Sequence, residues 1–180
     1  MAQTGTQHVF DVSLSDVDRG VYTQLSLKVA RHPSESEAYM LTRVLAFALE
    51  HEEGIAFTQG LSATDEPALW IRDLTDQLRA WIEVGTPNAA RLHKASKACD
   101  RVVVYCHKDM RVYLNSLAGQ KVHAPERVSI VPLERRFIEA LAAKIDRRNA
   151  MSVSVNEGEL YVDLGGESFT TTLARVGLPG

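Results

Sequence analysis

Acidic side chains stand beside two neighbouring predicted strands, at positions where they could act together. Asp65 and Glu66 come directly before one predicted strand, and Glu83 comes near the end of the next. If the two strands form a hairpin in which paired residue numbers add up to 151, Ala68 faces Glu83. Directly paired side chains lie roughly 5 Å apart and diagonal neighbours roughly 7–8 Å apart, so Glu83 comes within reach of both earlier acids. The spacing predicts a cluster of two or three carboxylates at one end of a sheet.

A cation is expected among these carboxylates, because their negative charges repel one another. Mg²⁺, or Mn²⁺ in its place, suits a few carboxylate oxygens plus water, and it can activate water for attack on a phosphodiester. Lys94, on a predicted helix after Glu83, would orient that water, and Arg91 lies three residues earlier on the same helix face. Glu35, at the start of an earlier predicted helix, is a candidate auxiliary acid or second-metal ligand. These side chains also fit plain structural roles, as turn formers, complements to a helix dipole or charges in water.

The elements that must position these residues follow from the pattern of apolar side chains. Alternating residues over 9–14 and 25–29 predict a β-hairpin with one buried face. Pro33 ends its second strand, and Ser34 is the predicted cap of a helix whose apolar stripe runs from Met40 to Leu49 and which Gly54 closes. Further strands are predicted at residues 55–58, 68–73, 78–84, 101–106, 127–133, 151–155, 159–164 and 169–171, and further helices at 88–98, 110–117 and 134–145.

This order predicts an α/β fold with a mixed central sheet and flanking helices. Residues 34–106 follow the order α-β-β-β-α-β, which many α/β folds contain, and an N-terminal hairpin and C-terminal strands add to it. No internal repeat or long linker interrupts the sequence, so one domain over residues 1–180 is expected.

Composition limits the function. The 180 residues include 20 Lys and Arg against 23 Asp and Glu, a net charge of −3, which excludes a strongly basic protein that wraps nucleic acid but leaves room for a local basic groove. No apolar run approaches the roughly 20 residues that span a bilayer, and the N-terminal residues lack the layout of a signal peptide. Cys99 and Cys106 match no zinc pattern and predict a reducing, cytoplasmic setting. No P-loop, GxGxxG or GxSxG motif indicates a nucleotide cofactor or a serine hydrolase.

Several short motifs occur along the chain in a specific combination. They are Arg31-His32-Pro33-Ser34-Glu35, Arg43-Val44-Leu45-Ala46, Asp65-Glu66-Pro67 with Trp70 and Arg72, Trp81-Ile82-Glu83 with Gly85 and Pro87, and Arg91 with Lys94-Ala95. In this combination they resemble the YaeQ family of small bacterial proteins, and the likeness covers nearly the whole chain. The resemblance implies a PD-(D/E)xK nuclease-like, that is restriction-endonuclease-like, core. That core agrees with the predicted order of elements.

Two departures from the superfamily's pattern bear on the site. Pro67 follows the acids instead of preceding one, which leaves Asp65 and Glu66 as alternatives for the first ligand. Gly85 stands where the pattern has lysine, and the resemblance matches Lys94 to a lysine that some members carry on the following helix. The missing lysine in the strand bears on catalysis more than on metal binding.

Two functions are consistent with these features. The first is Mg²⁺-dependent or Mn²⁺-dependent hydrolysis of phosphodiesters in nucleic acid, with metal ligands Asp65, Glu66 and Glu83 and the catalytic set Glu35, Asp65, Glu66, Glu83 and Lys94. The second is a module without catalysis that binds nucleic acid or a protein of the transcription or translation machinery, with no membrane partner. Ion pairs from Arg43 or Arg72 to the acids would favour the second function. Trp70 and Trp81 are interpreted as core packing ahead of base-stacking platforms.

Overall fold

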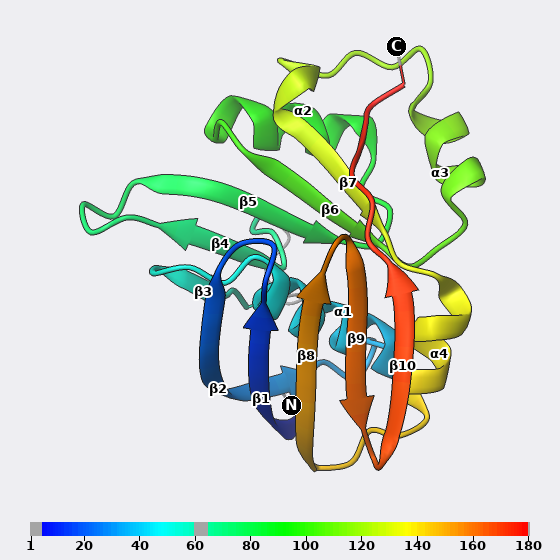
Figure 1. Cartoon of the computed structure of the whole chain (residues 1–180). Helices are drawn as coiled ribbons and strands as arrows, with labels where there is room; N and C mark the ends of the chain where they lie inside the picture. The colour runs from blue at the N-terminus through cyan, green and yellow to red at the C-terminus, as the bar shows by residue number, and fades with distance from the viewer. Residues whose placement is uncertain (1–4, 60–64, 180) are drawn as a thin grey trace. The chain divides into compact units, whose positions relative to one another are not determined.

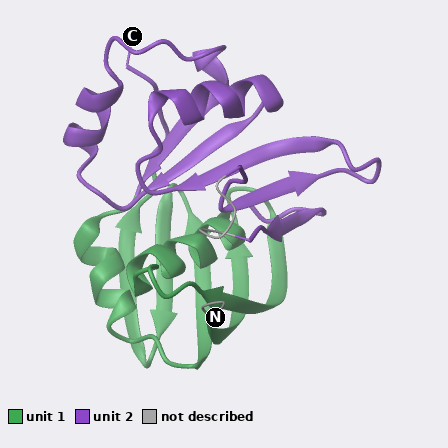
Figure 2. Cartoon of the chain, turned by 180° about the vertical axis from the view of Figure 1, so that it is seen from behind, with its two compact units in different colours: residues 1–49, 133–173 green, residues 50–132, 174–180 purple. Residues whose placement is uncertain are grey.

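Two units make up the chain, and each is assembled from two separate stretches (Figure 2). The computed structural model describes residues 5–59 and 65–179. Unit 1 comprises residues 1–49 and 133–173, and unit 2 comprises residues 50–132 and 174–180. This division into two units does not test the single domain predicted over residues 1–180, and that domain stays a prediction.

Unit 1 is built on a five-stranded mixed sheet (Figure 1). β1 pairs antiparallel with β2 and parallel with β8, which follows it in the chain by more than a hundred residues. β9 and β10 continue the sheet on the far side of β8 as antiparallel neighbours. In spatial order the strands are β10 (Glu167–Thr172), β9 (Glu159–Leu164), β8 (Arg148–Asn156), β1 (Thr6–Asp16) and β2 (Val21–Arg31).

Alternation along β1 gives this sheet one apolar face and one polar face. Phe10, Val12 and Leu14 are buried, whereas Asp11 and Ser13 between them are exposed, because successive side chains point to opposite faces. Helices α1 (Glu37–Leu49) and α4 (Arg135–Ala142) of the same unit pack against each other and contact strands of the sheet. Figure 2 shows both helices over one face.

The start of α1 differs from the prediction. Ser36, not Ser34, caps the helix, because its Oγ accepts a hydrogen bond of 3.0 Å from the backbone N–H of Tyr39. Glu35 therefore precedes the helix and does not belong to its first turn. Glu37 is the acidic residue that complements the positive end of the helix dipole.

Unit 2 contains a six-stranded mixed sheet. Its centre is parallel, since β5, β6 and β7 run in one direction, and antiparallel strands flank it on both sides. In spatial order the strands are β11 (Val176–Gly177), β7 (Val128–Pro132), β6 (Val102–Cys106), β5 (Leu78–Val84), β4 (Leu69–Arg72) and β3 (Ile55–Phe57).

Two helices close the core of unit 2. Asn88 caps α2 (Ala89–Ala98) and Asp109 caps α3 (Met110–Leu117), each by accepting a backbone hydrogen bond on its side chain. A short 3₁₀ turn (Pro125–Arg127) leads into β7. Apolar residues of both helices pack with alternate residues of the sheet strands, so the helices cover that face. This core consists of Trp81, Leu92, Ala95, Cys99, Val102, Val104, Cys106, Tyr113, Leu117, Val128 and Ile130.

The β4–β5 hairpin has the predicted register. Leu69 pairs with Ile82, Trp70 with Trp81 and Ile71 with Ala80, so the numbers of each pair add up to 151 as expected. A bulge after Ile71 shifts the next pair by one residue, and the turn beyond it contains Asp76 with a positive φ. The α/β class and the order α1-β3-β4-β5-α2-β6 are confirmed. The terminal strands form a second sheet of their own in unit 1.

Candidate functional site

Glu83 is a buried carboxylate on the helix-covered face of the unit 2 sheet. Strand alternation places it two residues after Trp81 on the same face, and only 4% of Glu83 is exposed. Its Oε1 accepts two hydrogen bonds of 2.7 Å, one from Trp81 Nε1 and one from Arg91 Nε. One carboxylate oxygen is therefore held by an indole and by a guanidinium.

The environment of Glu83 shifts its proton affinity. Burial raises the pKa of this carboxyl above its ordinary value, because the charged form loses contact with water. The positive charge of Arg91 and the hydrogen bonds from Trp81 and Arg91 act in the opposite direction without cancelling the effect. A buried carboxyl with a shifted pKa beside a specific cation marks a candidate functional site.

Arg91 connects three segments of unit 2. It lies in the first turn of α2, where its backbone N–H donates to the capping side chain of Asn88. Its Nε binds Glu83 at the end of β5, and its Nη2 donates to the backbone carbonyl of Glu66 at 2.6 Å. The guanidinium thus occupies the position of a cation between the buried acid and the loop that precedes β4.

Asp65 and Glu66 have different environments from Glu83. The Glu66 carboxylate accepts a hydrogen bond of 3.3 Å from the backbone N–H of Gln59. The side chain of Asp65 is 91% exposed, and its Oδ1 lies 3.5 Å from Lys94 Nζ, which is itself on an exposed side chain. Ion pairs of this exposed kind contribute little to stability. Asp65 and Lys94 therefore meet at the surface, where water can reach both.

Glu35 belongs to unit 1, whereas the other predicted site residues belong to unit 2. Its Oε1 lies 2.6 Å from Arg43 Nη2 and 2.8 Å from Arg43 Nε, and both side chains are nearly inaccessible to water. The other oxygen, Oε2, accepts a hydrogen bond from the backbone N–H of His32. Within unit 1, Glu35 therefore neutralises a buried arginine.

Unit 2 brings together four of the predicted residues: Asp65 meets Lys94, and Arg91 links Glu66 to Glu83. Arg43 pairs with Glu35 and Arg72 with the turn residue Asp76, so these ion pairs are not the anticipated ones with the Asp65, Glu66 or Glu83 carboxylates. The position of Arg91 beside the acids agrees with its predicted place on the helix after Glu83. The indole N–H of Trp81 was not predicted as a donor to Glu83, although their i, i+2 spacing on one strand was a usable signal.

The arrangement does not fit Mg²⁺ or Mn²⁺ as it stands. Among residues 5–59 and 65–179, no group of three or more His, Cys, Asp or Glu side chains could hold a metal ion. Glu83 already accepts two hydrogen bonds on Oε1, and Glu66 uses its carboxylate on a backbone N–H. Metal ligation by Asp65, Glu66 and Glu83 stays a prediction, and it would need Arg91 to leave the buried acid.

A second buried acid in unit 2 was not anticipated from the sequence. Glu50 is 2% exposed as a side chain, and its carboxylate binds Arg101, Arg175 Nη2 at 2.7 Å and Tyr105 Oη at 2.7 Å. Burial raises its pKa, but the two arginines and the tyrosine outweigh burial and lower the pKa overall. Glu50 thereby fixes the C-terminal segment to β6.

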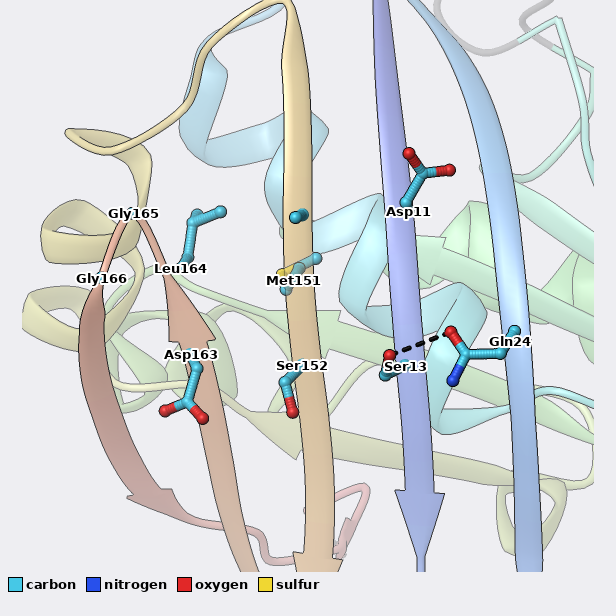
Figure 3. Close-up of a pocket in the computed structure, with 10 residues that line it drawn as sticks. Asp11, Ser13, Gln24, Met151, Ser152, Asp163, Leu164, Gly165 and Gly166 are labelled. Carbon is cyan, nitrogen blue, oxygen red and sulfur yellow. Dashed lines mark hydrogen bonds between the residues drawn. The ribbon is translucent and has the colours of Figure 1, made fainter.

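The polar face of the unit 1 sheet carries an open hollow of about 350 Å³ (Figure 3). Asp11 on β1 and Asp163 on β9 point from its floor, and Ser13 on β1 donates a hydrogen bond to Gln24 on the edge strand β2. The ten described residues that line it include no Lys or Arg. Two carboxylates without a cation repel a polyanion, so unit 2 is the better candidate for contact with phosphate groups.

Within the described part of the chain, no helix is long and apolar enough to cross a membrane.

Comparison with known proteins gives one consistent result. The chain is 29% identical over 163 residues to "Uncharacterized protein YaeQ" of Escherichia coli K12, and equally to that of Salmonella typhi, with 90% of each chain covered. The crystal structure of the YaeQ protein from Pseudomonas syringae matches with a TM-score of 0.86 and 34% identity over 98% of this chain and 97% of that one. The crystal structure of the Xanthomonas axonopodis pv. citri protein matches with a TM-score of 0.84 and 32% identity over 98% and 99%. A family model described as "YaeQ protein" matches residues 1–173, and this chain therefore belongs to the YaeQ protein family.

Proposed function

We propose that this chain binds nucleic acid at the Glu83–Arg91 cluster of unit 2 without hydrolysing it. One observation carries the proposal: the Arg91 guanidinium, not an open space, lies between Glu83 and the Glu66 carbonyl. A scaffold whose buried acid is already neutralised by an arginine keeps the shape of the site but lacks a free set of metal ligands. Such a scaffold can present cations to phosphate groups.

The charge distribution supports contact with phosphate in unit 2. Eleven Lys and Arg and eleven Asp and Glu fall in unit 2, so the entire net charge of −3 resides in unit 1. Lys94 and Lys97 are exposed on α2, and together with Arg91 they form a basic row at intervals of three residues. A local basic row on a neutral unit suits a short phosphate backbone better than an extended duplex.

Hydrolysis dependent on Mg²⁺ or Mn²⁺ is the second candidate, and one contact favours it. Lys94 lies beside Asp65 at the surface, as a lysine that orients an attacking water next to a carboxylate would. Membership of the PD-(D/E)xK superfamily, which this hydrolytic function would require, is proposed together with it. The ion would supply Lewis-acid activation of the phosphodiester, and Asp65, Glu66 and Glu83 would be its ligands only once Arg91 had left Glu83.

Fluorescence anisotropy with labelled oligonucleotides tests the binding proposal. Single-stranded DNA, single-stranded RNA and duplexes of equal length are titrated with wild type, with a K94A/K97A variant, and with a K28A/R148A variant that removes two exposed cations of unit 1. K94A/K97A should weaken binding and reduce the salt slope by about 0.7 for each phosphate of a single strand that the variant no longer neutralises. K28A/R148A should bind like wild type.

The same oligonucleotides report on the alternatives. Absence of binding to every nucleic acid at low salt would overturn the proposal and favour a protein partner. Cleavage that needs Mg²⁺ or Mn²⁺ and disappears in Glu83→Gln would replace it with the hydrolytic function. Equal weakening by the two double variants would show that binding does not occur at α2.

A further inference from the structure

We propose that Trp70 and Arg72 on β4 form a stacking platform for an unpaired base, so that the nucleic acid bound by unit 2 is single-stranded. This inference rests on the proposed function and names the class of ligand. The Arg72 Cζ lies 4.4 Å from the centroid of the Trp70 ring, so the guanidinium covers the indole. A guanidinium plane stacked on an aromatic ring offers its other face to a base.

Arg72 is held in place from a second direction. Its Nη1 donates a hydrogen bond of 2.9 Å to the backbone carbonyl of Asp76 in the hairpin turn. The turn is itself ordered, because the Asp73 side chain accepts hydrogen bonds from the backbone of Thr75 and Gln77. The Arg72 side chain is nevertheless 34% exposed. A guanidinium that is held in place and partly exposed loses little conformational entropy when a flat ligand stacks on it.

The pair lies next to the Glu83–Arg91 cluster on the same sheet. Trp70 pairs directly with Trp81, and Trp81 donates its indole N–H to Glu83, which binds Arg91. Side chains of directly paired residues lie about 5 Å apart on one face of a sheet, so the Trp70 side chain adjoins the aromatic partner of the buried acid. The proposed stacking pair is therefore connected through Trp81 and Glu83 to Arg91 of the proposed phosphate-binding row.

Trp70 and Trp81 have different roles. Trp81 is 5% exposed and belongs to the core beneath α2, which confirms the core interpretation for this residue. Trp70 is only partly buried and carries an arginine over its ring. Bases within a duplex are already stacked on both sides, whereas unpaired bases can be stacked on aromatic or guanidinium planes. The platform therefore favours single strands.

A matched pair of conservative variants tests the inference. Arg72→Lys keeps the charge but removes the plane, and Arg79→Lys makes the same change at an exposed arginine of the same hairpin that pairs with Asp73. Binding of a labelled twelve-residue thymidine oligonucleotide should weaken about 5-fold or more in Arg72→Lys, by analogy with loss of one stacked base, and less than 2-fold in Arg79→Lys. Duplex binding should change little in either variant. Thermal unfolding of each variant shows whether the fold is retained.

Tryptophan emission gives an independent measurement. Unlabelled oligonucleotide should change the emission of wild type, and Trp70→Phe should remove most of that change, because Trp81 is buried in the core. If wild type binds no nucleic acid, the proposed function fails and the inference fails with it. If wild type binds single strands while Arg72→Lys and Arg79→Lys weaken binding equally, only the stacking inference is overturned. The stacking inference would also be overturned if duplexes bound as strongly as single strands and the tryptophan emission did not change on binding.

Discussion

Replacing Arg91 with methionine isolates the interaction that neutralises Glu83. Methionine keeps much of the apolar stem but removes the hydrogen bonds to the Glu83 carboxylate and the Glu66 carbonyl. Removing one partner of a buried ion pair costs about 3–5 kcal/mol, because the other charge stays buried without compensation. The Arg91 side chain is 32% exposed, so water screens part of this loss. Since Trp81 also still donates to Glu83, we expect a decrease of about 2 kcal/mol in the free energy of unfolding at neutral pH.

Urea unfolding of four proteins measures this value and its origin: wild type, Arg91→Met, Glu83→Gln and the double variant. Glutamine removes the buried charge, so Arg91→Met should cost only about 1 kcal/mol in that background, which gives a coupling of about 1 kcal/mol. Arg79→Met is the control, because it breaks an exposed ion pair with Asp73 and should cost less than about 1 kcal/mol.

The pH dependence has a definite sign. Burial raises the pKa of Glu83 and Arg91 opposes that rise, so loss of Arg91 raises the pKa further. The folded variant then takes up a proton at this carboxyl more readily than the unfolded chain does. The decrease in the free energy of unfolding that Arg91→Met causes should therefore become smaller as the pH falls from about 7 to about 5. An equal cost of Arg91→Met in the wild-type and Glu83→Gln backgrounds, at either pH, would refute the claim that Arg91 compensates a buried charge.

Three further outcomes are expected. Burial, assisted by the charge of Lys108, lowers the pKa of His107 from 6.5 to about 4, so the fold loses stability as the pH falls from 6.5 toward 4. His107→Gln should reduce the pH dependence of the free energy of unfolding over this range, by at most about 3 kcal/mol in urea unfolding, and an unchanged pH dependence would contradict the assignment. Gly54→Ala should lower the free energy of unfolding by about 2 kcal/mol or more, because Gly54 has a φ of +92° and a Cβ there would lie 1.9 Å from the backbone oxygen of Arg72. A variant as stable as wild type in urea unfolding would show that the backbone of β4 at Arg72 can move aside. Arg43→Met should cost about 3–5 kcal/mol by leaving the Glu35 carboxylate buried and uncompensated, and a far smaller loss by thermal unfolding would mean that water reaches that acid.

Local patterns in the sequence were sufficient to predict most elements of the fold. β5 and α3 have the predicted bounds, and the β4–β5 register follows from the alternation of residues on either side of a polar turn. The parallel pairing of β1 with β8, which makes a second sheet, was not predicted, because periodicity within a strand carries no information about a partner far away in the chain. Ser34 and Ser36 are both good capping residues, and only the backbone geometry distinguishes them, so the cap of α1 was predicted two residues too early.

The sequence was sufficient to predict which residues lie near one another in the candidate site, but not which groups their side chains bind. Spacing on strands and on α2 placed Glu83, Arg91 and Lys94 near the acids before β4. Whether a carboxylate accepts from a guanidinium or holds a metal ion depends on side-chain directions within a few ångströms, which residue spacing does not determine. The position of Glu35 in the other unit likewise depends on how distant stretches assemble.

The interleaved assembly of the two units has a consequence for synthesis. As the nascent chain leaves the ribosome, β1 and β2 emerge before the other described strands, yet the parallel neighbour of β1 begins only at Arg148. Until then the apolar row of Phe10, Val12 and Leu14 lacks its adjoining strand on one side and the later helix α4 of its unit. Unit 2, whose stretch 50–132 is made in between, can form most of its sheet first. β1 and β2, although translated before the rest of both sheets, should thus be among the last elements to reach their native environment, and the hairpin is where a ribosome-associated chaperone would find exposed apolar side chains.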